Sequence, residues 1–167
     1  LNYNDAHERY RERYRAMMLL THLCGMRIGE VVNLKVSDVI DYNCKVKTEI
    51  QLTNKQAKGQ QARTVFVSKR MRKELDRYIK HAVMRFSGGF LFKTQKSQRF
   101  SSNTATQLLQ RIYERSGLSG ATSHSGRRSF ITELATKGIS VRVLAELAGH
   151  QSIATTQRYI DINDDMH

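Results

Sequence analysis

The sequence predicts one mainly α-helical domain with a small antiparallel β-sheet, an α+β fold. Three observations predict it. Apolar residues near the N-terminus recur at helical spacing, short stretches between residues 36 and 67 have the composition of strands joined by turns, and serine and glycine recur where helices would begin and end. The chain of 167 residues is long enough for one domain with a hydrophobic core, and it has no proline. We therefore expect helix ends to depend on glycine and on capping side chains.

The first predicted element is a helix over residues 7–24, in which Tyr10 and Met17 fall on one side at helical spacing. The simplest interpretation of this apolar side is a surface that faces the core. Gly25 ends the helix, and a second short helix follows over residues 28–34.

Three strands are predicted next, over residues 36–41, 45–52 and 62–67. A turn joins the first two strands, and a polar, basic stretch over residues 53–61 joins the last two. The sequence therefore predicts a small antiparallel sheet with one basic hairpin tip.

The rest of the chain predicts five helices and a short buried segment over residues 90–92. The helices span residues 68–86, 102 or 103 to 115, 124–136 and 141–148, and a last short one begins after Ser152 and carries Tyr159 near its end. The helix over residues 68–86 presents many lysines and arginines. Such a surface is either a solvated helix face or a surface that meets an anion.

The charge balance is strongly positive. Lys and Arg number 28 against 15 Asp and Glu, a net charge of +13. A chain this basic usually meets a polyanion, and nucleic acid is the commonest one. The alternatives are an anionic membrane surface or a basic protein without such a partner. No apolar run is long enough to cross a bilayer, and two lone cysteines fit a reducing cytosol, so we expect a cytoplasmic protein. The cysteines lack a metal-binding pattern, so we expect no bound metal.

Six polar residues from separate segments suit one kind of chemistry, and they are Arg27, Lys58, His124, Arg127, His150 and Tyr159. Two guanidinium groups can hold a phosphate, a lysine and two histidines can move protons, and a phenol can attack. Taken singly, each has an ordinary interpretation, such as a surface arginine, a mobile lysine or a histidine at a helix end. The motifs that carry them read Gly25-Met26-Arg27-Ile28-Gly29-Glu30, Ser123-His124-Ser125-Gly126-Arg127-Arg128, Leu147-Ala148-Gly149-His150 and Thr155-Thr156-Gln157-Arg158-Tyr159-Ile160.

In this order and at these spacings, the motifs resemble the catalytic domain of the tyrosine recombinases, also called the phage integrase family. The resemblance covers nearly the whole chain, from the first helix to Tyr159, and the interval of nine positions from His150 to Tyr159 is the usual one. Members usually carry a separate helical DNA-clamping domain before this one, and nothing here resembles it. We therefore expect residues 1–167 to be a single catalytic domain and a piece of a longer protein.

The resemblance implies cleavage of DNA without metal, cofactor or ATP. Arg27 and Arg127 would each fork onto phosphate oxygens, and Glu30, one helical turn after Arg27, would orient it. His124 lies three positions before Arg127, so both could point from one helix face at the same phosphate. The resemblance assigns His124 to proton transfer around the tyrosine hydroxyl and His150 to a hydrogen bond with a phosphate oxygen.

The resemblance makes Tyr159 the nucleophile, which would leave a 3′-phosphotyrosine and a free 5′ hydroxyl. Lys58 on the hairpin would protonate the leaving 5′ oxygen, with Lys55 on the same loop as the alternative general acid. Lys55, Arg63 (at a common family position) and Arg128 are the further residues expected to contact DNA.

Two positions depart from the family pattern. Gly126 stands where a leucine is usual, which would remove a buried anchor and loosen the placement of Arg127. Phe66 stands where a proline is common. All six functional positions keep a usable side chain, so the sequence predicts an active enzyme.

Three functions are compatible with these residues. The first is a site-specific recombinase or integrase that exchanges strands of double-stranded DNA through a tetrameric synapse. The second is a type IB topoisomerase-like enzyme that relaxes supercoils, and the third is a basic DNA-binding module without chemistry. The spacing from Leu147 to Tyr159 favours the first. The segment over residues 161–167 either docks on a neighbouring protomer or is a frayed tail.

Overall fold

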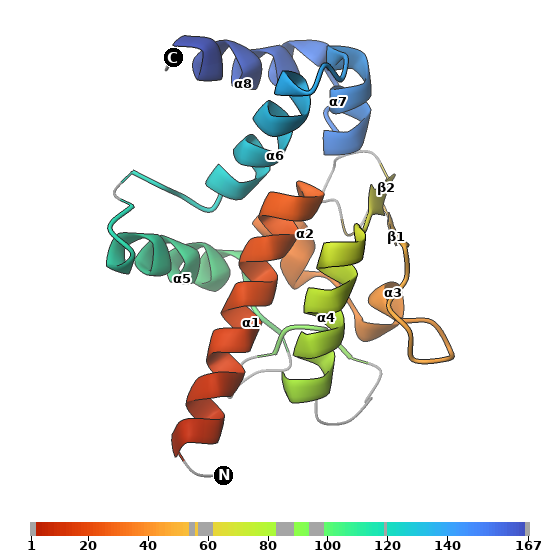
Figure 1. Cartoon of the computed structure of the whole chain (residues 1–167), viewed down its shortest axis with the longest axis vertical. Helices are drawn as coiled ribbons and strands as arrows, with labels where there is room; N and C mark the ends of the chain where they lie inside the picture. The colour runs from red at the N-terminus through yellow and green to blue at the C-terminus, as the bar shows by residue number, and fades with distance from the viewer. Residues whose placement is uncertain are drawn as a thin grey trace.

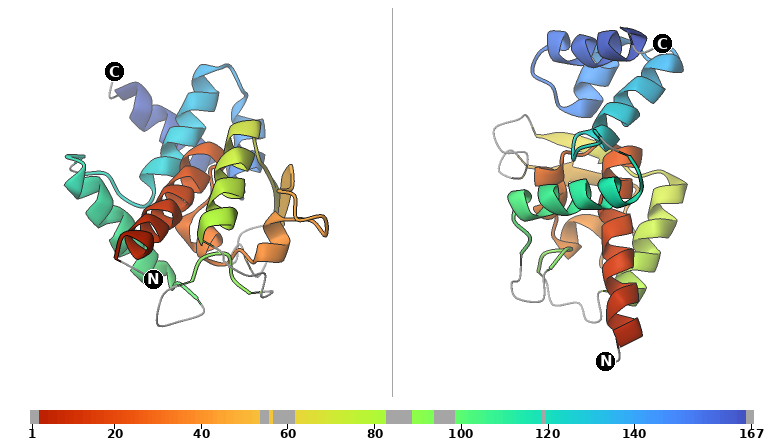
Figure 2. Two further views of the ribbon diagram at one scale, coloured as in Figure 1. Left: turned by 60° about the horizontal axis from the view of Figure 1, so that its bottom comes forward. Right: turned by 90° about the vertical axis from the view of Figure 1, so that its left-hand side faces the viewer.

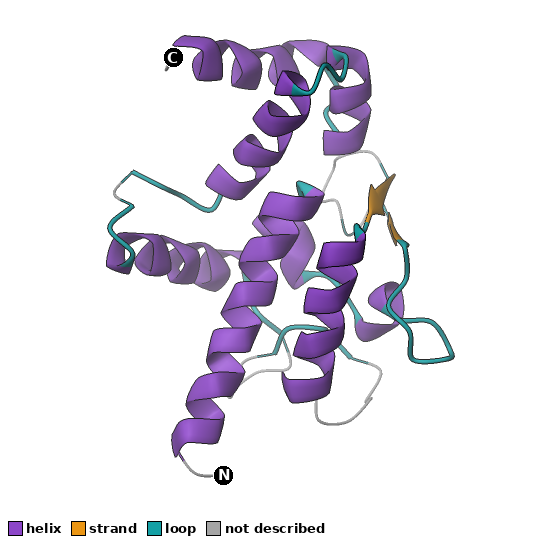
Figure 3. Cartoon of the chain, viewed as in Figure 1, coloured by secondary structure: helices purple, strands orange, loops and turns teal. Residues whose placement is uncertain are grey.

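The structure is a computed structural model that describes residues 3–53, 56, 62–82, 89–93, 99–118 and 120–165, without the side chains of residues 3–10, 82 and 163–165. Helices dominate, and two strands form a small sheet (Figures 1 and 3). In chain order the elements are α1 (Tyr3–Cys24), α2 (Ile28–Val32), α3 (Val36–Val39), β1 (Glu49–Leu52), β2 (Arg63–Phe66), α4 (Lys69–Ala82), α5 (Ser102–Arg115), α6 (Ser125–Thr136), α7 (Val141–Ala148) and α8 (Ile153–Asp165). The predicted mainly α-helical fold with a small antiparallel sheet is confirmed.

Helix α1 is the central element. It packs against α4 over one part of its length and against α6 at its C-terminal part, while α5 packs across α2 (Figures 1 and 2). The main core lies among these elements and the sheet, and includes Met17, Leu34, Leu75 and Phe92. The apolar side predicted on the first helix faces this core at Met17, which is buried within it.

The sheet consists of β1 and β2, which pair antiparallel with Ile50 opposite Val65. Burial alternates along both strands, so that Ile50, Leu52 and Val65 face the core while Glu49 and Phe66 face outward. This alternation is the period-two pattern of a half-buried strand. It also brings Arg63, at the start of β2, to the inner side of the sheet.

The strand predicted over residues 36–41 is wrong, because residues 36–39 form the short helix α3. Its β-branched residues favoured a strand, but the carboxylate of Asp38 accepts a hydrogen bond from the backbone N–H of Lys35 at 2.8 Å and closes a helical turn. The second strand also begins later than predicted, at Glu49, and before it there is only an isolated bridge between Ile40 and Val46.

Several helix ends differ from the prediction by a few residues. Helix α1 already begins at Tyr3, and α5 is capped by Ser101, whose hydroxyl accepts from the N–H of Thr104 at 3.1 Å. Helix α8 continues to Asp165, so Tyr159 lies in its middle, and residues 161–165 are helical rather than a frayed tail. The end of the helix predicted over residues 68–86 falls partly outside the described residues.

Helices α6, α7 and α8 share a second, smaller core whose buried members are Ile131, Leu144 and Ala148. Helix α6 connects this smaller core to the main core. It contacts α1 at Gly126, where an added Cβ atom would overlap the side chain of Thr21 on α1. The glycine therefore permits the two helices to approach closely. The sequence predicts that the missing leucine loosens the placement of Arg127, but this structure has no space for a larger side chain at position 126.

Candidate active site

The site is built around one buried carboxylate, that of Glu30 in the first turn of α2. Glu30 is 2% exposed. Its Oε1 accepts hydrogen bonds from the backbone N–H of Arg27 and from Nη2 of Arg63, both at 2.8 Å, and its Oε2 pairs with Nη1 of Arg63. Glu30 therefore holds the loop before α2 and the start of β2 together.

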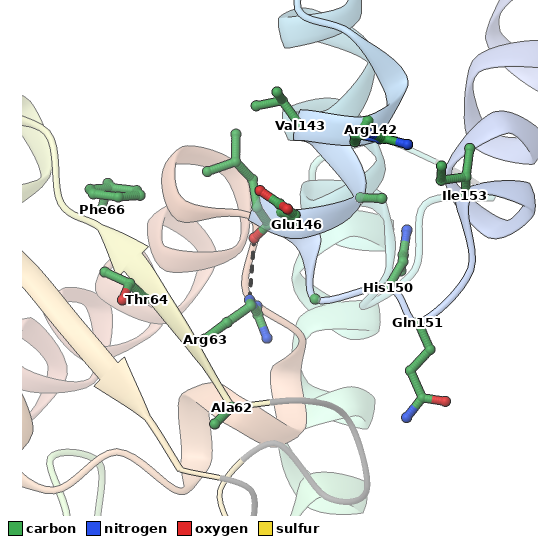
Figure 4. A pocket seen from close by; sticks show the side chains of 13 residues that line it. Ala62, Arg63, Thr64, Phe66, Arg142, Val143, Glu146, His150, Gln151 and Ile153 are labelled. Carbon is green, nitrogen blue, oxygen red and sulfur yellow. Dashed lines mark hydrogen bonds between the residues drawn. The ribbon is translucent and has the colours of Figure 1, made fainter.

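Arg63 is buried and connects two elements of the fold. Besides Glu30, its Nε donates to the backbone carbonyl of Leu147 at 3.2 Å, so its guanidinium connects β2 with the end of α7 (Figure 4). Gly149 makes this passage possible, since a Cβ atom there would lie 2.8 Å from Cδ of Arg63. Gly149 also has a φ of 72°, which other residues rarely adopt. The sequence predicts that Arg63 contacts DNA; in this structure its side chain is buried and its three guanidinium nitrogens donate to Glu30 and Leu147.

Arg127 is buried more completely, at 1% exposure, near the start of α6. Its Nη1 donates to the carbonyl of Gly25 at 2.6 Å and its Nη2 to the carbonyl of Ala148. It therefore joins the C-terminal ends of α1 and α7, and its Nη1 lies 4.0 Å from Oε1 of Glu30. Burial lowers the pKa of Arg127 to about 9, with the charges of Arg27 and Arg63 acting in the same direction, which still leaves it cationic at neutral pH.

Arg27 is the more accessible of the two arginines predicted to hold phosphate, with 26% of its side chain exposed. Its Nη1 lies 3.9 Å from Oε2 of Glu30, and burial lowers its pKa despite this carboxylate. Within the described residues, Nη1 of Arg27 and Nε of Arg127 are buried without a hydrogen-bond partner. Three guanidinium groups thus surround one carboxylate. The excess positive charge and the two unused donors fit an anion such as a phosphate.

His150 follows the glycine that ends α7 and lies against α8. Its Nδ1 is 2.6 Å from Oγ1 of Thr156, and its ring stacks on that of Tyr159 with 5.6 Å between centroids and 2° between planes. Burial, and after it the charges of Arg127, Arg27, Arg63 and Arg158, lower the pKa of His150 to about 4, so the ring is neutral at pH 7. Arg63 and His150 both line a groove of about 580 Å³ between β2 and α7 (Figure 4).

Tyr159 is half-buried on α8 and packs against the smaller core. Its ring stacks on that of His150, and a negative charge on its phenol oxygen would raise the pKa of both Arg27 and Arg127. The structure therefore brings together Arg27, Arg127, His150 and Tyr159, as the sequence predicted. It also places Glu30 beside Arg27, as predicted.

The other predicted site residues are not gathered in this way. His124 is exposed at the N-cap of α6, three positions before Arg127, and its ring makes no hydrogen bond among the described residues. Arg128 is exposed on α6, unlike its buried neighbour. Lys58 and Lys55 lie outside the described residues.

Thr156 is a site residue that the sequence reasoning missed. It is fully buried on α8 and contacts His150. Thr156 and Tyr159 are three positions apart, so they share a helix face. Its position could have been predicted from the sequence. Thr156 lies on the helix face that carries the predicted nucleophile, and a buried hydroxyl there requires a hydrogen-bond partner.

The described residues contain no group of three or more His, Cys, Asp or Glu side chains that could hold a metal ion. Among the helices of this same part of the chain, none has the length and apolar character needed to cross a membrane.

Comparison with known proteins identifies the family of this chain. Residues 2–166 match the model of the phage integrase family. Tyrosine recombinase XerD of Mycobacterium leprae is 35% identical over 156 residues, which are 88% of this chain and 47% of that protein. Tyrosine recombinase XerA of Pyrococcus horikoshii is 29% identical over 153 residues, which are 90% of this chain and 50% of that protein. The chain thus spans about half the length of these curated relatives.

Solved structures show the same fold. The crystal structure of XerA recombinase superposes with a TM-score of 0.75 at 25% identity, covering 99% of this chain and 61% of that one. XerH site-specific recombinase bound to palindromic difH substrate superposes with a TM-score of 0.71 at 23% identity, covering 90% of this chain and 42% of that one. Because the family model matches nearly every residue, the chain belongs to the phage integrase family, the tyrosine recombinases, and has the fold of their catalytic domains.

Proposed function

We propose that this chain is the catalytic domain of a site-specific DNA recombinase or integrase, which cuts and rejoins strands through a covalent bond to Tyr159. The observation that carries the proposal is the convergence of Arg27, Arg127, His150 and Tyr159 around a buried cluster with excess positive charge. Relatives named tyrosine recombinases and a structure of such an enzyme bound to its DNA substrate support the same function.

The chemistry follows from the groups present. Arg27 and Arg127 bind the non-bridging oxygens of the scissile phosphate, where negative charge grows during the reaction. His150 donates a further hydrogen bond to a phosphate oxygen. The unused donors on Nη1 of Arg27 and Nε of Arg127 support this role, because a phosphate oxygen would satisfy them.

The bond changes balance without a metal, a cofactor or ATP. The phenol oxygen of Tyr159 forms a bond to phosphorus, and the bond from phosphorus to the 5′ oxygen breaks. Lys58 gives that oxygen a proton, with Lys55 as the alternative donor, and His124 takes part in proton transfer at the phenol. A 5′ hydroxyl then attacks the phosphotyrosine and releases Tyr159. The covalent bond conserves the energy needed for religation.

The wider setting is part of the proposal. The partner is double-stranded DNA at a specific recombination site in the cytoplasm, and strand exchange takes place in a tetramer assembled on that DNA. The net charge of +13 supports a DNA partner, since phosphate contacts by Lys and Arg release counterions. Exposed Arg128 is available for such contacts.

The decisive test is a covalent adduct. The purified chain is incubated with sheared genomic DNA from its source, the mixture is denatured, and DNA that remains attached to protein is recovered and sequenced. We expect wild type to retain DNA that shares one short sequence, and Tyr159→Phe to retain none. A nicked duplex with that sequence should then trap the adduct. If wild type and Tyr159→Phe retained equal DNA, a binding module without chemistry would replace this proposal.

The same assay separates strand exchange from relaxation alone. Adducts at one sequence, together with joined products from two duplexes, indicate a recombinase. Adducts spread over unrelated sequences, with relaxation of a supercoiled plasmid and no joined products, would indicate a type IB topoisomerase-like enzyme.

A further inference from the structure

One polar contact at the site takes no part in the proposed reaction steps. Oγ1 of Thr156 lies 2.6 Å from Nδ1 of His150, and the threonine is fully buried. The contact joins the residue after α7 to the middle of α8. A buried hydroxyl at this distance from an imidazole nitrogen forms a hydrogen bond with it. The direction of that hydrogen bond decides which nitrogen of the ring carries the proton.

We propose that Thr156 is a positioning residue that donates its hydroxyl hydrogen to Nδ1 of His150, so that Nε2 keeps its hydrogen and serves as the donor to a phosphate oxygen. The inference rests on the proposed function, because the acceptor is the scissile phosphate. It adds a residue that controls the state of the donor without contacting DNA itself.

The neutral state of the ring makes this control necessary. Burial and the guanidiniums of Arg127, Arg27, Arg63 and Arg158 hold the pKa of His150 to about 4, so at pH 7 the ring carries one hydrogen on one of two nitrogens. A cationic ring would offer N–H groups on both sides, whatever its neighbours. A neutral ring offers only one, and the neighbouring group selects it.

The requirements on the two sides of the ring allow one arrangement. Phosphodiester oxygens accept hydrogen bonds and cannot donate them, so the nitrogen that faces the phosphate has to carry the hydrogen. Nδ1 then has a free electron pair that needs a donor. A threonine hydroxyl can either donate or accept, and here it has to donate. Valine has the same shape and no hydroxyl, so the proposal can be tested at one atom.

The same helix also fixes the plane of the ring. Thr156 holds the edge of the imidazole while Tyr159, three positions later on the same face of α8, stacks on it at 2° between planes. A flip of the ring about its side-chain bonds would break the hydrogen bond. The helix that carries the nucleophile therefore also sets the tautomer of the phosphate donor.

The test compares wild type with Thr156→Val and Thr156→Ser. The ¹⁵N spectrum of the imidazoles, with His150 assigned from the spectrum of His150→Gln, shows which nitrogen is protonated. In wild type at pH 7 we expect Nε2 to be protonated and Nδ1 to show the shift of a hydrogen-bonded acceptor. Thr156→Val should remove that shift, and Thr156→Ser should retain it.

Adduct formation on the recovered site gives the second readout. We expect Thr156→Val to slow cleavage about tenfold with little change in DNA affinity, by analogy with groups that orient a metal-binding histidine. Thr156→Ser should restore most of the rate. Thr155→Val is the matched control, since Thr155 precedes Thr156 on the same helix and its hydroxyl accepts from Arg158 at 3.4 Å. It should leave both the spectrum and the rate unchanged.

Each outcome decides the matter. A hydrogen on Nδ1 in wild type, or an unchanged Nδ1 signal in Thr156→Val, overturns the proposal. A slow Thr156→Ser that melts at the wild-type temperature also overturns it, because the hydroxyl would not be what matters. The expected spectra in a protein that never forms an adduct would uphold the role of Thr156 in setting the tautomer and overturn the proposed function instead.

Discussion

Helices α1 to α5 and helices α6 to α8 are stabilised in different ways. The first region buries a large apolar core with the sheet, whereas the second shares a small one centred on Ile131, Leu144 and Ala148. The contacts between the two regions include charged groups, with Arg63 on the carbonyl of Leu147 and Arg127 on the carbonyl of Gly25. The second region therefore depends more on buried polar contacts than the first.

The proposed catalytic groups lie on both sides of this boundary. Arg27 belongs to the first region, while Arg127, His150 and Tyr159 belong to the second. Buried charges around Glu30 therefore contribute to the relative placement of Arg27 and Arg127. A buried ionic cluster stabilises a structure only when every charge has its partners, and removing one leaves the others uncompensated. The comparison thus predicts that polar changes at the boundary will be as damaging as apolar changes in the main core.

The largest effect is expected from Glu30→Gln. The change removes the carboxylate that Arg63 binds and that Arg27 and Arg127 approach, and it should lower the free energy of unfolding by roughly 3–5 kcal/mol. Denaturant titration measures this loss. Hydrogen exchange should increase most in α7 and α8, because Arg63 would no longer be held against Glu30.

Glu74→Gln is the matched control. Glu74 pairs with Arg15 at 2.9 Å on the surface, where ion pairs contribute about 1 kcal/mol or less. Equal losses for the two variants would contradict the view that the buried cluster joins the two regions.

The next effect compares Leu75→Ala with Leu144→Ala. Both leucines are fully buried, the first in the large core and the second in the small one. Leu75→Ala should destabilise the protein by roughly 2–5 kcal/mol, because its well-packed surroundings cannot close the cavity. Leu144→Ala should destabilise it less, while hydrogen exchange rises locally in α7 and α8. If both variants raised exchange evenly throughout the protein, the two regions would unfold as one unit.

A smaller effect tests the close approach of α6 to α1. Gly126→Leu restores the residue usual in the family but overlaps Thr21, so we expect a loss of roughly 1–3 kcal/mol in unfolding free energy. Cleavage should fall as well, since Arg127 is the next residue. Ser129→Leu places the same side chain at an exposed position of α6 and should change stability little. A Gly126→Leu protein as stable as wild type would mean that the two helices can separate without loss.

The smallest effect concerns acid stability. The pKa of His150 is lowered to about 4, and that of His22 is also lowered, by burial. Both rings are harder to protonate in the folded state, so their contribution to stability is complete above the ordinary histidine pKa of about 6.5 and declines as pH falls toward the folded-state value. Melting temperatures between about pH 7.5 and 3.5, a range that spans this decline, measure it.

Replacing either histidine should make the melting temperature less dependent on pH. His150→Gln should do so more strongly than His22→Gln, because arginine charges add to burial at His150, whereas burial alone acts at His22. The reverse order would indicate that the arginines do not surround His150 as the structure shows.

Much of the fold could be predicted from local chemistry. Ser68 caps α4 by accepting from the N–H of Met71, and Gly149 ends α7 in the left-handed conformation, as serine and glycine at these places suggest. The stretch after Leu34 could not be predicted in this way. Its valines favour a strand, and one capping hydrogen bond to Asp38 makes it a helix.

By itself the sequence determined the order of the motifs, the excess of positive charge and the approximate bounds of most helices, because these depend on composition and on neighbours in the chain. Only the tertiary structure decided which cations are internal. Arg127 is buried while adjacent Arg128 is exposed, and Arg63 is occupied by Glu30 and Leu147. The physical reason is that a charge can be buried only where distant carboxylates and carbonyls compensate it, and spacing along the chain does not show where those partners lie.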